Sequence, residues 1–314
     1  MSMTKTILIT GGSGFVGAGI VRKLVREKWD VHVILRKGSS LQRISDIADK
    51  IKIHYDLLHK SRELSALMKK KSPFAIYHLA THGAYPNQHD AQTMIDINVK
   101  GTMNLLQSLV GIDYKHLIVA GSSSEYGGKD NPMKETDYLE PNNFYAATKA
   151  AQTLLCQAFA KKYKKSVAIL RLFSVYGPAE EKGRFVRSVI ESVLSNKKIL
   201  LASGKEARDF IFIEDVVRAF LHTTKQKKRF DGEIFNIGTG IETTTHQLAS
   251  HIVSLVGRNI PIQRNAYQGR SWDVYHWRAD MTKTNRILRW KPSYSLDQGL
   301  AETIQWYESN LQMK

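Results

Sequence analysis

The sequence predicts an α/β protein with a doubly wound parallel sheet and a smaller mixed lobe after it. Short β-branched and apolar runs alternate with longer amphipathic stretches as far as about residue 180. This alternation is typical of parallel strands joined by crossover helices that cover both faces of a sheet. A glycine-rich segment follows the first apolar run directly, as it does at many turns from a strand into a helix.

Six apolar runs are the expected strands, and they lie at 6–10, 31–35, 51–54, 75–80, 116–120 and 166–171. Helical patterns lie between them, most clearly at 14–27, 90–109 and 143–164. Beyond about residue 180, glycines and prolines interrupt the order more often. We therefore expect a dinucleotide-binding domain over 1–175. A mainly substrate-binding lobe over 176–314 is expected to follow, with some chain crossing back to the first domain.

The composition is that of an ordinary globular protein, with 42% hydrophobic and 9% aromatic residues in 314. No apolar run reaches the roughly 18 residues that a membrane-spanning helix needs. The first residues lack the features of a secretion signal, and the single cysteine, Cys156, excludes an internal disulfide. From these two features we expect a cytoplasmic protein. We expect no metal site, because no His, Cys, Asp or Glu residues have the spacing of metal ligands.

The net charge of +17 has several explanations: nucleic acid, an acidic membrane surface, an anionic small substrate or a solvated basic surface. The basic residues are spread over short clusters such as 69–71 and 225–229. Most of these clusters follow a helical pattern, where cations complement the negative end of the helix dipole. The pattern favours a basic surface with an anionic ligand and makes a nucleic-acid partner unlikely.

Three glycines at a spacing of three follow the first expected strand and open the first expected helix. Gly11 allows a tight turn, Gly14 allows backbone to approach a pyrophosphate, and Gly17 allows the helix to pack closely on the strand. A plain strand-to-helix turn is the alternative. The loop residues expected at a dinucleotide are Gly11, Ser13, Gly14, Phe15, Val16 and Gly17.

The end of the second expected strand bears on which dinucleotide binds. NAD-preferring sites usually have Asp or Glu there for the ribose 2′-hydroxyl. This chain has Arg36 and Lys37 instead, which can bind a 2′-phosphate as charged donors. The residues favour NADP(H) and leave NAD(H) possible. Two exposed basic residues at a strand exit are the alternative.

Tyr145 and Lys149 are four residues apart at the start of an expected helix and so share one face. A free phenol has a pKa of about 10, and lowering it by about three units requires roughly 4 kcal/mol. A neighbouring ammonium and a cationic nicotinamide can supply that field. Ser122, Ser123 and Ser124 follow the fifth expected strand, where a hydroxyl can donate to a substrate oxygen. A polar loop or a helix cap is the alternative for these serines.

On these residues the chain resembles the extended short-chain dehydrogenases/reductases of the NAD-dependent epimerase/dehydratase type, which act on nucleotide sugars and have a Rossmann-like fold. The resemblance covers nearly all 314 residues. It implies that Tyr145 is the acid/base, that Lys149 binds the nicotinamide ribose, and that Ser122 is the catalytic hydroxyl. The further cofactor contacts implied are Asp56, Leu57, Leu79, Ala80 and Asn98. The implied or expected substrate contacts are His82, Ser123, Ser124, Ser174, Arg184, Phe185, Arg208 and Arg270.

Together, the basic residues Arg36 and Lys37 and the Tyr145–Lys149 pair favour NADPH-dependent reduction of a nucleotide-4-keto-(6-deoxy)sugar, with Tyr145 as proton donor. The alternatives are a 4-epimerase with a retained cofactor, a 4,6-dehydratase, and a non-catalytic dinucleotide sensor or RNA-binding relative. Dehydratases of this type usually carry Asp-Glu after the catalytic hydroxyl, whereas Ser123 and Ser124 follow Ser122 here. A one-residue shift of the loop would bring Glu125 into that role. The resemblance also implies a homodimer, in which helices 90–109 and 143–164 form a four-helix bundle.

Overall fold

The computed structural model describes residues 5–85, 87–268 and 275–311. The chain forms two compact units. The first comprises Met1–Gly127, Pro141–Arg171 and Val217–Phe235, and the second comprises Gly128–Glu140, Leu172–Val216 and Asn236–Lys314. Both units are therefore built from separate stretches of chain. The boundary predicted near residue 175 stays a prediction.

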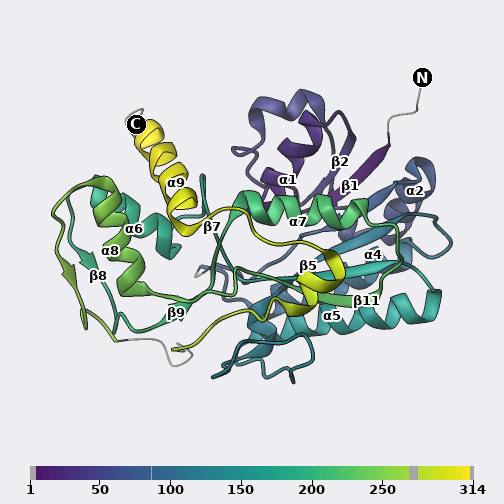
Figure 1. Cartoon of the computed structure of the whole chain (residues 1–314). Coiled ribbons are helices and arrows are strands. Elements are labelled where there is room, and N and C mark those ends of the chain that lie inside the picture. The colour runs from purple at the N-terminus through teal and green to yellow at the C-terminus, as the bar shows by residue number, and fades with distance from the viewer. Residues whose placement is uncertain (1–4, 86, 269–274, 312–314) are drawn as a thin grey trace. The chain divides into compact units, whose positions relative to one another are not determined.

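The first unit is built on a seven-stranded parallel sheet, and the predicted α/β fold is confirmed. The strand order is β11-β6-β5-β4-β1-β2-β3, so the chain winds outward from β1 in both directions (Figure 1). The strands are β1 (Thr6–Thr10), β2 (Asp30–Leu35), β3 (Lys52–Tyr55), β4 (Ala75–His78), β5 (His116–Ser122), β6 (Val167–Leu172) and β11 (Asp231–Ile237). The carboxyl ends of β1, β2, β4 and β5 meet at one edge, because these neighbours pair in parallel register.

Helices cover both faces of this sheet (Figure 1). They are α1 (Phe15–Arg26), α2 (Ser61–Lys71), α3 (Ala91–Met94), α4 (Gly101–Ser108), α5 (Phe144–Tyr163) and α7 (Ile213–Lys225). Single-turn segments lie at η1 (Ser45–Lys50), η2 (Leu57–His59) and η4 (Ser123–Tyr126). Alternate residues of one strand serve the two faces. Ile76 of β4 packs with α2, α4 and α5, while the neighbouring Tyr77 packs on Phe220 of α7.

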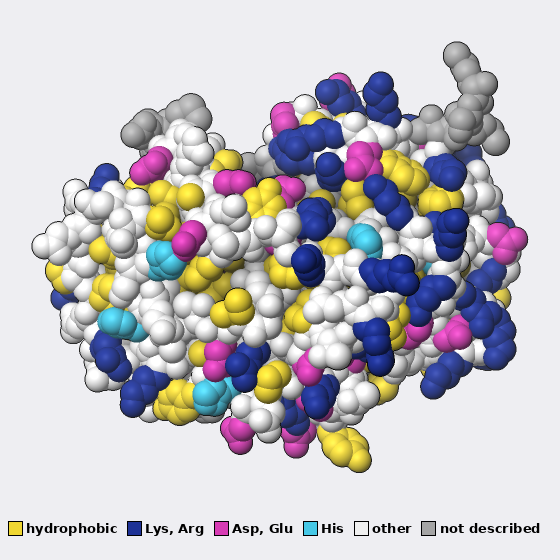
Figure 2. All heavy atoms as spheres, in the orientation of Figure 1, with side chains coloured by type: hydrophobic (Ala, Val, Ile, Leu, Met, Phe, Trp, Pro, Cys, Tyr) yellow, Lys and Arg dark blue, Asp and Glu magenta, His cyan; other side chains and the backbone are white. Residues whose placement is uncertain are grey.

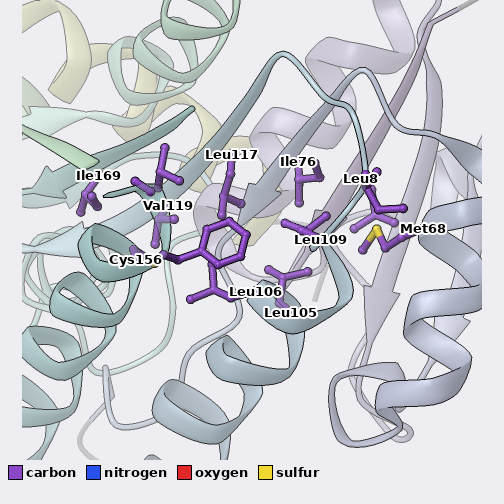
Figure 3. Packing of buried hydrophobic residues seen from close by; sticks show 14 of the residues in the cluster. Leu8, Met68, Ile76, Leu105, Leu106, Leu109, Leu117, Val119, Cys156 and Ile169 are labelled. Carbon is purple, nitrogen blue, oxygen red and sulfur yellow. The ribbon is translucent and has the colours of Figure 1, made fainter. Parts of the chain in front are cut away.

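The core between the sheet and α2, α4 and α5 consists of apolar side chains from every layer, most of them aliphatic (Figure 3). Leu8, Ile76 and Leu117 come from three neighbouring strands, and each has 0% of its surface exposed. Leu105 and Cys156 meet them from the helices, and both are also fully buried. Full burial of a Leu or Ile side chain contributes roughly 1.5–3 kcal/mol. Cys156 is a packed thiol in this core, and the same burial raises its pKa to about 12.

The helix predicted over 90–109 is interrupted by a π-helical segment, η3 (Ile95–Lys100), between α3 and α4. Such a segment adds one residue to the turn and changes which side chains face inward. Here it places Asn98 in the interior with 0% exposure. The predicted helix over 143–164 agrees closely with α5, and Asn143 caps it by accepting the Ala146 N–H at 2.9 Å.

The second unit contains three two-stranded sheets and their helices, in agreement with the predicted mixed lobe. The strands are β7 (Ser174–Tyr176) with β10 (Phe210–Phe212), β9 (Ala207–Arg208) with β12 (Thr243–Thr244), and β8 (Ile199–Leu200) with β13 (Ile262–Gln263). The remaining helical segments are α6 (Phe185–Leu194), α8 (Thr245–Val256), η5 (Thr284–Leu288) and α9 (Leu296–Leu311). Tyr176, Phe210 and Phe212 form an aromatic core in this unit.

On the face drawn in Figure 2, many lysines and arginines are interspersed with acidic and apolar side chains. Among the described residues, no helix is both long enough and apolar enough to span a bilayer. Within the same residues, no three His, Cys, Asp or Glu side chains are grouped in a way that would hold a metal ion.

Candidate active site

The glycine loop between β1 and α1 is shaped by close backbone contacts. Gly11 has a φ of +72°, and a Cβ there would lie 2.7 Å from the Ala80 nitrogen. A Cβ on Gly17 would lie 2.2 Å from the Gly11 oxygen, whereas one on Gly14 would lie 3.3 Å from it. Gly11 and Gly17 are therefore required by packing. A Cβ on Gly14 would be in tight contact with backbone but not in direct overlap, so packing constrains Gly14 less than it constrains Gly11 and Gly17.

The start of α1 fits a negatively charged group. Gly14 is the N-cap and supplies no side chain to the first N–H groups, and the first turn carries no acidic residue. Such a helix start, with its positive dipole end, is suited to a pyrophosphate. Phe15 is buried, while Ser13 and Val16 are half-buried along the same turn. The loop as a whole thus fits the dinucleotide that the sequence predicts.

The exit of β2 places two cations next to this loop. Arg36 and Lys37 are exposed directly after the strand. Asp56 takes a left-handed backbone conformation with φ +59°, and its Oδ1 accepts the Lys37 N–H at 2.7 Å. This contact holds the β2 exit against the start of η2, where Leu57 is half-buried. One Asp56 oxygen is thus used within the protein, and its predicted adenine contact stays a prediction.

The exit of β4 lies against the glycine loop. The Leu79 N–H donates to the Thr10 carbonyl and the Ala80 N–H to the Thr10 hydroxyl, both at 3.1 Å. Asn98 then holds the following turn, because its Oδ1 accepts the His82 N–H at 2.8 Å and its Nδ2 donates to the His82 carbonyl at 2.9 Å. Burial and the Arg36 charge lower the pKa of His82. Arg36 therefore acts electrostatically on this turn.

Ser122 is the last residue of β5 and also the N-cap of η4. Its Oγ accepts the Ser124 N–H at 3.2 Å, and its own N–H donates to Glu125 Oε1 at 2.8 Å. Ser122 and Ser123 are buried, whereas Ser124 is half-buried. A hydroxyl that accepts one hydrogen bond still has its own O–H to donate. The cap therefore orients Ser122 and leaves it able to act on a substrate oxygen.

The structure corrects the expectation that a loop shift could bring Glu125 into a dehydratase role. Glu125 has 0% exposure. Its Oε2 lies 2.9 Å from Nη2 of Arg171 on β6 and accepts the Thr153 hydroxyl at 2.8 Å. Its Oε1 is taken by the Ser122 N–H. A carboxylate with both oxygens bonded inside the protein is not available to protonate a departing hydroxyl.

Tyr145 and Lys149 lie on the first two turns of α5. Tyr145 is half-buried, and Lys149 is 3% exposed. The Lys149 ammonium donates to the Ala120 carbonyl at 2.6 Å and also to Gln152 Oε1. Burial lowers the pKa of Lys149 to about 8, against the opposing effect of the Glu125 charge. The pair therefore stands beside the end of β5, where Ser122 lies.

A buried polar chain that the sequence analysis did not predict connects the glycine loop to this lysine. The Thr10 hydroxyl bonds His78 Nδ1 at 2.7 Å, and His78 Nε2 bonds the Thr102 hydroxyl at 2.8 Å. Gln152 donates to the Thr102 hydroxyl at 3.0 Å and accepts from Lys149. Burial, with the Lys149 charge, lowers the pKa of His78 to about 3, so this ring is neutral. Polar residues inside otherwise apolar strands and helices are the feature of the sequence from which these hydrogen bonds could have been inferred.

Ser123, Ser124 and His82 belong to the first unit. The other expected sugar and diphosphate contacts that the structure describes belong to the second unit. Ser174 begins β7, and its N–H donates to the Asp209 carbonyl at 2.9 Å. Arg184 occupies the N-cap position of α6, and its Nε lies 3.4 Å from Oε1 of buried Glu180. Half-buried Phe185 is the first residue of that helix.

Arg208 ends β9, with its guanidinium 5.3 Å from the Trp277 ring centre. Asp209, the next residue, is fully buried and accepts the Thr239, Gly240 and Ala279 N–H groups, which fixes the backbone beside Arg208. Arg270 lies outside the described residues.

Comparison with known proteins agrees with this geometry. The NAD dependent epimerase/dehydratase family matches residues 7–238. A UDP-glucuronate 4-epimerase of Thermodesulfobacterium geofontis is 27% identical, over 98% of this chain and 97% of its own. A dTDP-D-glucose 4,6-dehydratase of Mus musculus is 28% identical, over 98% and 90%. The solved structure of MoeE5 with UDP-glucose and NAD is 29% identical with a TM-score of 0.85, over 98% and 99%.

These similarities bear on the predicted reaction. The relatives named here are a 4-epimerase and a 4,6-dehydratase, and neither is a reductase. They support the 4-epimerase and 4,6-dehydratase alternatives better than the favoured reductase. The match over most of the chain, the seven-stranded sheet and the glycine loop at its first turn lead to one conclusion. The chain is an enzyme of the NAD dependent epimerase/dehydratase family, which acts on nucleotide sugars.

Proposed function

We propose that the protein is a nucleotide-sugar 4-epimerase that keeps its nicotinamide cofactor bound through turnover. The observation that carries the proposal is the arrangement at the end of β5. Ser122 stands there beside the helix of Tyr145 and Lys149, and Glu125 is tied to Arg171. This arrangement supports oxidation and reduction at a sugar carbon. The bonds that hold Glu125 inside the protein argue against its use as the acid in elimination of a hydroxyl.

Tyr145 is the proposed acid/base. It takes the proton of the sugar 4-hydroxyl and returns it after the keto-sugar has turned over. Ser122 donates to the same oxygen as negative charge builds on it. Lys149 supplies a positive field close to Tyr145 and favours its phenolate form. A bound nicotinamide would supply the hydride acceptor and donor for the sugar carbon.

The remaining roles follow the predicted assignments. The glycine loop would hold the pyrophosphate, Leu79 and Ala80 would line the cofactor, and Asp56 with Leu57 would face the adenine side. Asn98 would act by holding the turn that contains His82. In the substrate we assign the diphosphate to Arg208 and Arg270. The sugar contacts proposed are His82, Ser123, Ser124, Ser174, Arg184 and Phe185.

A second candidate, a 4-keto-sugar reductase, is favoured by one observation. Arg36 and Lys37 are exposed cations where a 2′-phosphate of NADP(H) would lie. NADP(H) leaves after each reduction, whereas an epimerase retains its cofactor. The family name and the MoeE5 structure both refer to NAD. The proposal is therefore an epimerase with NAD(H), and NADP(H) remains the cofactor of the reductase candidate.

One experiment separates the two candidates. The purified protein is denatured, and the released cofactor is identified by mass and absorbance. The native protein is then incubated with UDP-glucose or UDP-glucuronate without added cofactor, and the C4 epimer is measured. Epimer formation with bound NAD(H) supports the proposal. Loss of NADPH absorbance at 340 nm with a nucleotide-4-keto-6-deoxysugar, and no epimer, would replace it with the reductase.

We also propose a homodimer formed by a second copy of this chain. Large apolar side chains are exposed on the two helical segments that the sequence predicts for a bundle: Ile95, Met103 and Val110 on or next to η3 and α4, and Phe144 and Leu154 on α5. Pairing these faces would bury them from water. Light scattering should give about twice the 35.6 kDa chain mass. A Leu154→Asp variant should give the monomer mass, and a native monomer at micromolar concentration would contradict the proposal.

The cellular setting stays a proposal as well. A cytoplasmic location is consistent with one buried cysteine and with nucleotide-sugar substrates. Binding of nucleic acid is not part of the proposed function. Localisation of a tagged protein by cell fractionation tests the first point, and the salt dependence of RNA binding tests the second.

A further inference from the structure

The ion pair between Glu125 and Arg171 joins three elements under the candidate active site. Glu125 lies in η4, Arg171 in β6, and Thr153 in α5, and all three side chains are at most 1% exposed. Arg171 reaches the carboxylate with two nitrogens, Nη2 at 2.9 Å and Nε at 3.0 Å. The guanidinium also packs 4.4 Å from the centre of the Tyr126 ring.

Burying such a pair is expensive unless both partners are well bonded. Two charges taken out of water lose several kcal/mol of hydration each, and a well-packed apolar pair is often no less stable. Stability alone therefore gives a weak reason for this pair. The geometry around the carboxylate supplies a better one, because two of its bonds end on Ser122 and on α5, the helix that carries Tyr145 and Lys149.

One oxygen of Glu125 fixes the position of Ser122, since Oε1 accepts the Ser122 N–H at 2.8 Å. The other oxygen accepts the hydroxyl of Thr153, which lies one turn after Lys149 on the same helix. The carboxylate thus sets the distance between the β5 exit and α5. A displacement of either element would separate the Ser122 hydroxyl from the Tyr145–Lys149 face.

The charge of Glu125 also acts on Lys149. The titratable groups around this ammonium are His78 of β4, Glu125 of η4, and Tyr145 and Cys156 of α5, with Arg171 of β6 behind Glu125. Burial keeps His78 and the Cys156 thiol neutral near pH 7, with pKa values of about 3 and about 12. The Glu125 charge raises the pKa of Lys149 against its burial.

We propose that Glu125, held by Arg171, is a positioning residue. It fixes Ser122 relative to the helix that carries Tyr145 and Lys149, and it keeps Lys149 charged. This inference rests on the proposed epimerase reaction and adds a residue to it. Glu125 does not touch substrate in this role, because both of its oxygens are bonded within the protein.

Two variants separate position from charge. Glu125→Asp keeps the charge but shortens the side chain by one methylene. We expect kcat to fall at least tenfold with KM within threefold, and the high-pH limb of the kcat profile to stay in place. Hydrogen exchange of the peptide 120–127 should become at least tenfold faster. Glu233→Asp is the matched control at a half-buried position of β11, and it should behave as the native protein does.

The Glu125→Gln/Arg171→Met double variant removes both charges and keeps an oxygen that can accept the Ser122 N–H. We expect a folded protein with near-native exchange in 120–127. Its high-pH limb should move down by at least half a pH unit, because Lys149 loses the charge that supports its ammonium. A purely structural pair would leave this limb unchanged.

The outcomes separate the two proposals. Native kcat and native exchange in Glu125→Asp would overturn the positioning role, and an unmoved limb in the folded double variant would overturn the charge role. If the double variant does not fold, Glu125→Asp alone decides. If the native protein forms no epimer while Glu125→Asp still exchanges faster, the proposed function fails and the positioning of the Ser122 loop stands.

Discussion

Asn98 and Thr148 are 50 residues apart in the sequence, yet Asn98 Nδ2 donates to the Thr148 hydroxyl at 2.9 Å. The same amide holds both backbone groups of His82, and Thr148 in turn donates to the Tyr145 carbonyl. One buried side chain therefore connects the turn after β4 with the first turn of α5. The candidate site depends on this connection, because it joins the His82 turn to the helix that carries Tyr145 and Lys149.

Replacing Asn98 by Ala should destabilise the protein and loosen the His82 turn. The change leaves the His82 N–H and carbonyl without their partner, and an unpaired buried polar group costs about 1–3 kcal/mol. We expect the free energy of unfolding to fall by about 2–4 kcal/mol in urea titrations. Asn142→Ala, at an exposed position, is the control and should change it by less than about 0.5 kcal/mol.

Replacing Tyr145 by Phe should abolish turnover without loss of the cofactor. The variant keeps the ring and removes the hydroxyl that exchanges the proton, so kcat should fall at least about 1,000-fold. Cofactor content, measured after denaturation, should equal that of the native protein. Tyr163→Phe, at the far end of α5, is the control with native activity. Substantial activity in Tyr145→Phe would contradict the mechanism.

Lys149 should make stability rise with pH over an alkaline window. Its pKa is about 8 in the folded protein, where burial lowers it, and about 10.4 when unfolded. Between these values the unfolded chain binds more protons, so raising the pH favours the folded state. Relative to Lys149→Met, the native protein should gain about 2 kcal/mol between pH 7 and 9.5. An unchanged difference would show that the ammonium is not desolvated.

Gly14 and Gly17 of the glycine loop should respond differently to substitution by Ala. In Gly17→Ala the added methyl would lie 2.2 Å from the Gly11 oxygen, so the helix must move off the strand. We expect a loss of at least about 2 kcal/mol in unfolding free energy. Gly14→Ala meets its neighbour at 3.3 Å, so stability should change by less than about 1 kcal/mol while cofactor affinity falls. Equal stability of the two variants would contradict this reading of the loop.

The sequence predicted the first unit well, because its signals are local. The runs at β1, β2 and β5 are short and apolar, and the three glycines mark the turn into α1. The predicted residue Ser122 ends β5, and Tyr145 and Lys149 lie beside it on α5. Their catalytic roles stay predictions.

The interior connections could not be predicted in the same way. Asn98 points inward because η3 adds a residue to the helical turn, and nothing in the local pattern of 90–109 indicates a π-helical segment. The partner of Arg171 is 46 residues away in sequence. The paired strands β8 and β13 have two residues each, and such short strands are set by tertiary packing more than by local preference.

The placement of β11 at the edge of the main sheet has a consequence for synthesis of the chain. Its partner β6 ends at Leu172. The Val167 N–H of β6 donates to the Phe230 carbonyl, and Phe230 is synthesised about sixty residues after Val167. A chain that ends near residue 175 would therefore have an unpaired β6 edge. The nucleotide-binding half can mature only after much of the second lobe has already been made.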